Sequence, residues 1–192
     1  MSDPFTLFAT WFDEARACDA IREPTAMALA TATPNGVPSV RIVLLKGFDE
    51  RGFVFYTNLE SRKGSELAVN PHAALAFYWM PLDKQVRIEG RVAPVDVAEA
   101  DAYFASRDRL KQAGAWASQQ SRPLDARETL VTQTHAIEQQ YAGKPIPRPP
   151  YWSGFRLTPE RIEFWHQREA RLHEREVYVR NGSGWNHTLL YP

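Results

Sequence analysis

The chain has 192 residues, of which 44% are hydrophobic, and its 23 basic and 23 acidic residues give a formal net charge of zero. This length and composition predict a globular domain with a sizeable core and exclude a disordered chain. The balanced charge gives no general attraction to nucleic acid, and no apolar run approaches the roughly 20 residues of a membrane span. Cys18 is the only cysteine, so no intrachain disulfide is expected. The N-terminus lacks the features of a secretory signal, and a cytoplasmic protein is expected.

The first half of the chain predicts one helix and then a series of strands. Residues 5–20 carry apolar side chains at helical spacing, and residues 61–70 form a second, short helical segment that ends before Pro71. An Asn-Gly turn joins the first two strands into a β-hairpin, and FDERG forms a second turn. The expected strands cover residues 26–32, 37–46, 52–58, 73–79 and 84–92.

Helical patterns follow Pro94 and then give way to strands again. Residues 96–121 and 124–142 are rich in Ala, Gln, Glu and Leu, and the proline-rich residues 144–152 predict an extended connector. The last forty or so residues alternate as strands do and contain a second Asn-Gly turn. We therefore expect a mainly β fold with flanking helices, in which antiparallel strands close into a barrel and helices pack outside it. A doubly wound sheet needs a helix between successive strands, and it is excluded because residues 26–92 supply only one short helical segment, at 61–70.

Basic and polar residues gather at the ends of the strands over 37–46 and 52–58 and at the start of the next helix. Cations and unpaired backbone N–H groups at a helix start favour a phosphate group. An exposed surface of mixed charge explains the same pattern equally well. The residues concerned are Arg41, Lys46, Tyr56, Thr57, Asn58, Ser61, Arg62 and Lys63.

A second group lies in residues 163–178, which read EFWHQREARLHEREVY. As a strand, this segment directs Arg171, His173 and Arg175 to one face, which predicts a site for an anionic or electron-rich ligand. Neighbouring cations disfavour a metal ion, and no histidine pair has HExxH spacing, so no metal site is expected. A solvated charged strand is the alternative interpretation.

Several blocks occur in the order typical of pyridoxine/pyridoxamine 5′-phosphate oxidases, which the chain resembles from about residue 4 to its end. The blocks are RIVLLKGFDERGFVFYTNLESRKGSELAVNP, KQVRIEG, AYFASR, GAWASQQS, PRPPYW, IEFW and RLHER. The resemblance implies an FMN-binding split β-barrel that works as a homodimer, with FMN between the subunits. It implies oxidation of pyridoxamine 5′-phosphate and pyridoxine 5′-phosphate to pyridoxal 5′-phosphate, with O₂ reduced to H₂O₂.

The resemblance also implies the domain plan and the site residues. It implies one domain over residues 1–192, with an N-terminal helical segment 1–24, a helical insertion 95–142 and C-terminal strands 150–192 that complete the site. The implied FMN contacts, some of which reach across the dimer interface, are Arg41, Ile42, Val43, Leu44, Leu45, Lys46, Tyr56, Thr57, Arg62, Lys63, Gln85, Gln120, Ser121, Trp165 and Arg175. The implied substrate contacts are Lys46, Tyr103, Arg107, Lys111, Arg171 and His173. Arg171 and His173 are the implied catalytic residues, and His173 acts either as a base or as an orienting group.

The chain departs from the family pattern in places, and two other functions are compatible with it. Lys111 stands where the family usually has a serine that binds the substrate phosphate. The other departures are Asp108, Ser153, His166, Gln167, Glu174 and Leu189. The first alternative is a related flavin oxidase of the same fold, similar to those of phenazine pathways, which act on bulkier unphosphorylated acids. The second is a non-catalytic protein that binds flavin or a phosphorylated B6 vitamer.

Overall fold

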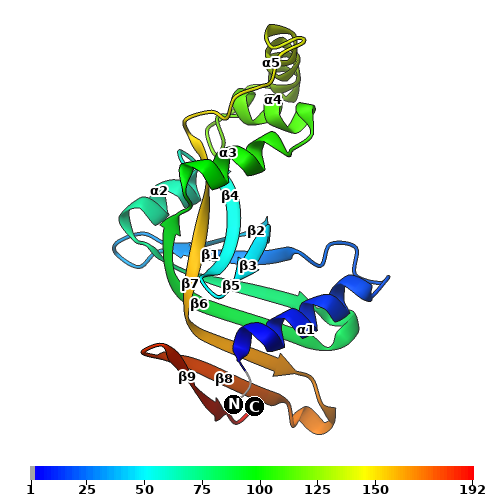
Figure 1. Ribbon diagram of the computed structural model, residues 1–192, viewed down its shortest axis with the longest axis vertical. Helices are drawn as coiled ribbons and strands as arrows, with labels where there is room; N and C mark the ends of the chain where they lie inside the picture. Colours follow the sequence, from blue (N-terminus) through cyan, green and yellow to red (C-terminus); the bar gives the residue numbers. More distant parts are fainter. Residues whose placement is uncertain (1–2) are drawn as a thin grey trace.

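An antiparallel sheet dominates the computed structural model, which describes residues 3–192 (Figure 1). Its strands are β1 (Ala26–Ala32), β2 (Pro38–Leu44), β3 (Gly47–Asp49), β4 (Gly52–Asn58), β5 (His72–Trp79), β6 (Lys84–Pro94), β7 (Trp152–His166), β8 (Glu174–Asn181) and β9 (Gly184–Leu189). The α-helices are α1 (Pro4–Ala17), α2 (Arg62–Val69), α3 (Val97–Ala105), α4 (Arg109–Ala117) and α5 (Arg127–Gln140). Residues 1–2 of the expected N-terminal helical segment lie outside the described residues.

The sheet curls because its two outer strands are neighbours in the chain. The strand order is β2-β1-β5-β6-β7-β4-β3, and β8 and β9 extend the sheet from β7. Only Leu45 and Lys46 separate the end of β2 from the start of β3, so the two ends of this order must lie close together. The Lys46 N–H donates to the Val54 carbonyl at 2.8 Å, which ties this junction to β4. The result is the barrel-like arrangement of antiparallel strands that the sequence predicts.

Strand β7 connects the parts of the sheet. It pairs with β6 along most of its length, with β4 through its first residues and with β8 through its last residues. Pro159 lies opposite Gly90, next to a shift in register after Glu89. A bulge accommodates a proline that cannot donate to the ladder. A Cβ atom on Gly90 would lie 2.1 Å from the Thr158 carbonyl oxygen, so this close approach requires glycine.

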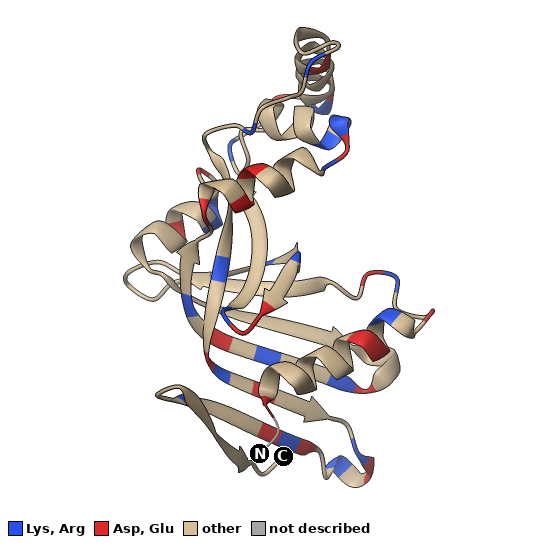
Figure 2. Ribbon diagram, in the orientation of Figure 1, with Lys and Arg blue, Asp and Glu red and all other residues tan. Residues whose placement is uncertain are grey.

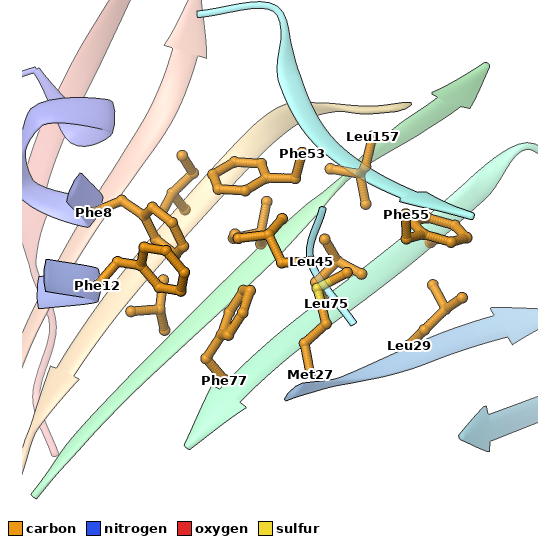
Figure 3. Close-up of a cluster of buried hydrophobic side chains, with 14 of the residues drawn as sticks. Phe8, Phe12, Met27, Leu29, Leu45, Phe53, Phe55, Leu75, Phe77 and Leu157 are labelled. Carbon is orange, nitrogen blue, oxygen red and sulfur yellow. The ribbon is translucent and has the colours of Figure 1, made fainter. Parts of the chain in front are cut away.

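Helix α1 supplies part of the core that the curled sheet encloses (Figure 3). Asp3 caps the helix by accepting from the Thr6 N–H at 3.0 Å. Phe8 is fully buried, and its ring centroid lies 4.9 Å from that of Phe53 and 5.3 Å from that of Phe77. Helix α1 thus flanks the curled sheet, as the sequence predicts for the helices, and its aromatic side chains also fill part of the interior.

Most elements lie where the sequence predicts them. The strands over residues 26–32 and 52–58 are confirmed with unchanged bounds. FDERG is not wholly a turn, because its first residues pair with β4 as the short strand β3. Residues 96–121 are not one helix, since α3 ends at Ala105 and α4 begins at Arg109.

Charged residues of both signs are spread over the elements. Figure 2 shows Lys and Arg segments beside Asp and Glu segments along the sheet and on α1, rather than one sign gathered in one part of the chain. In residues 3–192, no helix combines the length and apolar character needed to cross a bilayer.

Replacing Phe8 with alanine tests the role of α1 in the core. We expect the free energy of unfolding to fall by about 3–5 kcal/mol, because the change leaves a large cavity among packed rings. Urea denaturation measures this effect. Val97→Ala is the control, since Val97 is 69% exposed on α3 and its truncation should change stability by no more than about 0.5 kcal/mol. Equal effects of the two substitutions would contradict the assignment of α1 to the core.

Candidate functional site

An open cavity of about 860 Å³ lies where β2, β4 and α2 meet α3 and α4. Its size falls within the range of roughly 300–1,000 Å³ that is typical of small-molecule sites. Most of the residues that the sequence assigns to FMN or substrate line this one cavity. They are Arg41, Ile42, Val43, Leu44, Lys46, Tyr56, Thr57, Tyr103, Arg62, Lys63, Arg107, Lys111, Gln120 and Ser121.

Lys63 is a buried cation in the wall of the cavity. Its Nζ donates to Thr57 Oγ1 at 3.0 Å, to Gln120 Oε1 at 2.9 Å and to Ser61 Oγ at 3.2 Å. Ser61 is the N-cap of α2, so the lysine lies in the first turn of that helix. Burial, together with the charge of nearby Arg41, lowers the pKa of Lys63 to about 8. A lysine with this pKa is still mostly protonated at pH 7, and an anion bound here would stabilise the charged form, so this part of the cavity favours a phosphate group.

Arg41 and Arg62, the other two cations on this side of the cavity, share one carboxylate. Arg62 Nε donates to Glu66 Oε1 at 2.9 Å, and Arg41 lies 3.4 Å from Glu66 Oε2. Burial opposes ionisation of Glu66, but hydrogen bonds from Ser39, Thr31 and Arg62 outweigh it and lower its pKa to about 2. Glu66 is therefore an anion at neutral pH.

A second wall of the cavity is aromatic and carries Arg107. The ring of Tyr56 stacks on Tyr103 at 4.0 Å and on Trp152 at 5.3 Å. The Arg107 guanidinium lies 4.8 Å above the Trp152 ring, and burial lowers the arginine's pKa. One terminal nitrogen of Arg107 is buried and has no hydrogen-bond partner among residues 3–192. Such a donor fits an anionic ligand that supplies the missing acceptor.

The remaining predicted site residues do not line the cavity. Leu45 is 3% exposed and belongs to the core, because neighbours on an extended segment point to opposite sides. The others lie around the far end of β7, where Trp165 pairs with Gln85 on β6 and with Arg175 on β8. They form a group that we call the C-terminal cluster: Gln85, Trp165, Arg171, His173 and Arg175.

Strand β7 separates the C-terminal cluster from the cavity within one chain. Trp152 lies at the first residue of β7 and lines the cavity, whereas Trp165 lies near its last residue. A strand of 15 residues spans up to about 50 Å along its path. Figure 1 shows α3 and α4 near one end of β7 and strands β8 and β9 near the other.

The expectation that Arg171, His173 and Arg175 share one strand face is wrong. Glu169–Arg171 forms a 3₁₀ turn, and Ala170 (φ 53°) and Arg171 (φ 61°) have left-handed backbones. Strand β8 begins only at Glu174, so Arg175 is the only member of the three on the strand. The turn contains mostly charged residues, so it lacks the alternation of apolar and polar side chains that favours an extended strand.

His173 and Arg175 are nevertheless held in defined positions. The His173 ring lies 4.8 Å from the Trp165 ring, and its Nδ1 accepts from the Arg168 N–H at 3.2 Å. Arg175 Nε donates to Glu163 Oε1 at 2.9 Å. Glu163 is fully buried and also pairs with Arg87 and Arg161. Burial opposes its ionisation, but these arginines outweigh it and lower the pKa of Glu163 to about 2.

His166, a departure from the family pattern, has a packing role. Its ring meets the Trp11 ring of α1 edge-on at 5.9 Å, and Arg168 approaches its Nε2 at 3.1 Å. Burial and the charges of Arg168 and Lys84 lower its pKa. His166 therefore links the end of β7 to α1. Among residues 3–192, no group of three His, Cys, Asp or Glu side chains is arranged to hold a metal ion.

Comparison with known proteins gives two family matches that together span most of the chain. Residues 13–141 match the pyridoxamine 5′-phosphate oxidase model. Residues 152–192 match the C-terminal dimerisation region of pyridoxine 5′-phosphate oxidase. The chain belongs to the pyridoxine/pyridoxamine 5′-phosphate oxidase family. The second match contains Trp165, Arg171, His173 and Arg175 of the C-terminal cluster.

Family members of known name are similar along nearly their whole length. The pyridoxine/pyridoxamine 5′-phosphate oxidase of Gluconobacter oxydans is 60% identical over 191 residues, which cover 100% of this chain and 95% of the relative. The enzyme of the same name from Myxococcus xanthus is 58% identical over 190 residues, covering 99% and 92% of the two chains.

Solved structures confirm the predicted fold class, a mainly β split barrel with flanking helices. PhzG from Burkholderia lata, solved with tetrahydrophenazine-1-carboxylic acid, has a TM-score of 0.94 at 38% identity and covers 100% of this chain and 94% of its own. An FMN-binding protein from Nostoc punctiforme, related to pyridoxamine 5′-phosphate oxidase, has a TM-score of 0.77 at 19% identity and covers 100% and 99%. At 19% identity, the similarity to the Nostoc punctiforme protein shows a shared fold only.

Several residues of this region were not singled out from the sequence, among them Ser39, Trp152 and Glu66. Ser39 lines the cavity two residues before Arg41, and period-two alternation along β2 is the signal that predicts it. Trp152 lines the cavity from β7, and no local pattern indicates this. Glu66 lies one helical turn after Arg62, a spacing that predicts the ion pair but not the contact with Arg41.

The pH dependence of stability tests the environment of Lys63. Its folded pKa of about 8 lies below the ordinary 10.5, so the unfolded chain binds more protons between these pH values. The contribution of Lys63 to the free energy of unfolding should therefore rise from pH 8 to 10.5. Urea denaturation of wild type and Lys63→Met across this pH range isolates the contribution of Lys63. All other groups titrate in both proteins, so their contributions cancel in the difference. A constant difference between the two curves would contradict the low pKa.

Proposed function

We propose that this chain is an FMN-dependent oxidase that converts pyridoxamine 5′-phosphate and pyridoxine 5′-phosphate to pyridoxal 5′-phosphate, with O₂ reduced to H₂O₂. The observation that carries this proposal is the single cavity that gathers the predicted FMN and substrate residues. The names of the relatives and the family match support the same activity. In this proposal residues 1–192 form one FMN-binding domain, in which residues 95–142 are a helical insertion and residues 150–192 complete the site.

The residues around Lys63 fit the phosphate of FMN. Lys63 and Arg62 supply positive charge, and Thr57 supplies a hydroxyl next to the lysine. When bound, FMN would supply the hydride acceptor for oxidation of the substrate carbon and the means of passing the electrons to O₂. The chain's own residues hold the cofactor and orient the substrate against it.

The residues around Arg107 fit the phosphate of the substrate. Arg107, Lys111 and Tyr103 line the same cavity, and the buried Arg107 nitrogen without a partner suits a phosphate oxygen. Lys111 pairs with Asp108 at 2.7 Å, and both side chains are exposed. An exposed ion pair is weak, so Lys111 can exchange Asp108 for a phosphate at little cost. Binding energy at the phosphate then orients the reacting carbon.

A homodimer accounts for the C-terminal cluster. These residues are predicted to contact FMN or substrate, yet they lie away from the cavity of their own chain. The dimerisation match over residues 152–192 supports completion of each cavity by the partner subunit's C-terminal cluster. Val40 and Ile42 on β2 are 69% and 66% exposed, which suits an apolar surface that a second copy covers.

His173 is proposed to orient the substrate rather than to remove a proton. Its Nδ1 accepts from the Arg168 N–H, so a neutral ring carries its proton on Nε2. In that form Nε2 donates a hydrogen bond, and neither nitrogen has a free lone pair for a substrate proton. Arg171, in the neighbouring turn, adds a cation that orients an electron-rich ring.

Two other functions make different predictions. The close likeness to PhzG favours a flavin oxidase that acts on a tricyclic acid such as tetrahydrophenazine-1-carboxylic acid. Arg107 and Lys111 favour a phosphorylated substrate instead. A non-catalytic binding protein would bind pyridoxal 5′-phosphate without turnover.

The activity is tested by loading the protein with FMN and measuring H₂O₂ release with each phosphorylated vitamer. We expect turnover with both vitamers and none with the unphosphorylated alcohol, because the substrate phosphate supplies the orienting contacts. Arg171→Ala should lower kcat/KM at least about tenfold while the FMN content stays near normal. The proposed activity would be contradicted if the protein took up no FMN or oxidised only the tricyclic acid.

Mixed dimers test whether two subunits build each site. Arg107→Ala removes a cavity residue and Arg171→Ala removes a residue of the C-terminal cluster. If each site uses both subunits, a mixed dimer of the two variants contains one intact site. Refolding the variants together should then restore about a quarter of wild-type activity at low substrate concentration. Sites built within one chain would give no recovery above the two separate variants.

A further inference from the structure

Glu66 is a buried carboxylate beside a site that binds anions. It is 6% exposed on α2, and its Oε2 accepts from Ser39 Oγ at 2.6 Å and from Thr31 Oγ1. Its Oε1 accepts from Arg62 Nε at 2.9 Å, and Arg41 lies 3.4 Å from Oε2. Ser39, Arg41 and Arg62 all line the cavity, so the carboxylate joins three parts of one wall.

The charge of Glu66 by itself opposes the proposed role of this wall. A carboxylate near a phosphate dianion weakens phosphate binding by repulsion. Burying the carboxylate also has a desolvation cost, which its hydrogen bonds must offset. Glu66 can therefore strengthen phosphate binding only in one way. The affinity gained by positioning the cations must exceed the affinity lost through repulsion between the carboxylate and the phosphate.

The hydrogen bonds of Arg41 and Arg62 indicate this geometry. Arg41 donates through one terminal nitrogen to Leu29 O (3.0 Å) and Thr31 Oγ1 (2.6 Å), and through the other to Ser39 Oγ (2.6 Å) and Glu66. These hydrogen bonds occupy both terminal nitrogens of Arg41, so this residue can attract a ligand mainly through its positive charge. Arg62 uses only Nε to reach Glu66, so both of its terminal nitrogens remain available for two parallel hydrogen bonds to a phosphate.

We propose that Glu66 is a positioning residue for the flavin phosphate, which holds Arg62 by its Nε so that the two terminal nitrogens of the guanidinium meet the phosphate. Arg41, held by the same carboxylate, contributes charge. This inference rests on the proposed FMN site and goes beyond it, because it assigns a role to a residue that does not line the cavity. An unpaired Arg62, in the first turn of α2 and exposed, would sample many rotamers and lose entropy on binding.

The affinity of the protein for FMN distinguishes positioning from simple neutralisation of charge. FMN is removed, and the fluorescence of added FMN is titrated at pH 7 for wild type, Glu66→Ala and Glu66→Gln. Positioning predicts a Kd at least about tenfold higher in Glu66→Ala. Glu66→Gln keeps one acceptor oxygen and should lie between wild type and Glu66→Ala. Neutralisation predicts the opposite sign, a lower Kd in both variants, because a negative charge has been removed.

A matched control and a second background separate positioning from general damage to the fold. Glu99→Ala removes a carboxylate that accepts a hydrogen bond from Arg156 at 3.1 Å, and neither residue lines the cavity. The Kd of this variant for FMN should therefore stay within about twofold of the wild-type value. In an Arg62→Ala background, Glu66→Ala should lose its weakening effect, because the residue through which Glu66 acts is gone. The same loss of affinity in both backgrounds would overturn the proposal.

The outcomes also distinguish this inference from the function on which it rests. If wild type binds no FMN, the proposed function fails. If wild type binds FMN and Glu66→Ala binds it equally well or better, only the positioning role is overturned. If Glu66→Ala does not fold, Glu66→Gln decides: a Kd at least about threefold higher supports the proposal, and an unchanged or lower Kd overturns it.

Discussion

The two-residue link between β2 and β3 is the constraint on which the rest of the structure depends. Leu45 and Lys46 join the strands at the two ends of the sheet order, so the sheet must curl until those strands meet. The backbone N–H groups of both residues donate at 2.8 Å, to Thr25 and to Val54. Their side chains then take opposite sides, with Leu45 in the core and Lys46 in the cavity wall. One short segment thus closes the barrel and places a cation at the candidate site.

Arginines at both ends of β7 are held by buried carboxylates. Glu66 joins Arg41 and Arg62 beside the cavity, and Glu163 joins Arg175 of the C-terminal cluster to Arg87 and Arg161. A buried carboxylate is stabilised only when it is well paired, so each one fixes the guanidinium groups around it. The same arrangement therefore prepares two separate surfaces, which the proposed dimer would bring together.

Much of the fold and part of the site could be predicted from the sequence. Period-two alternation and Asn-Gly turns predict the strands, because these patterns depend on neighbouring residues. Blocks such as YTN and SRK predict Tyr56, Thr57, Arg62 and Lys63, which do line one cavity. The sequence does not predict the turn at Glu169–Arg171, since its left-handed residues Ala170 and Arg171 carry no glycine signal.

The sequence by itself determined which residues belong to most of the strands, which cations gather near a helix start, and the family of the chain. Only the tertiary structure decided that aromatic side chains of α1 complete the core, that Glu66 joins two arginines, and that the predicted site residues divide between a cavity and a distant cluster. These features depend on contacts between residues far apart in the chain. Thr31 and Glu66 are 35 positions apart, and their contact requires that α2 pack against β1. Local patterns contain no information about such contacts, because they arise only when distant segments of the chain pack together.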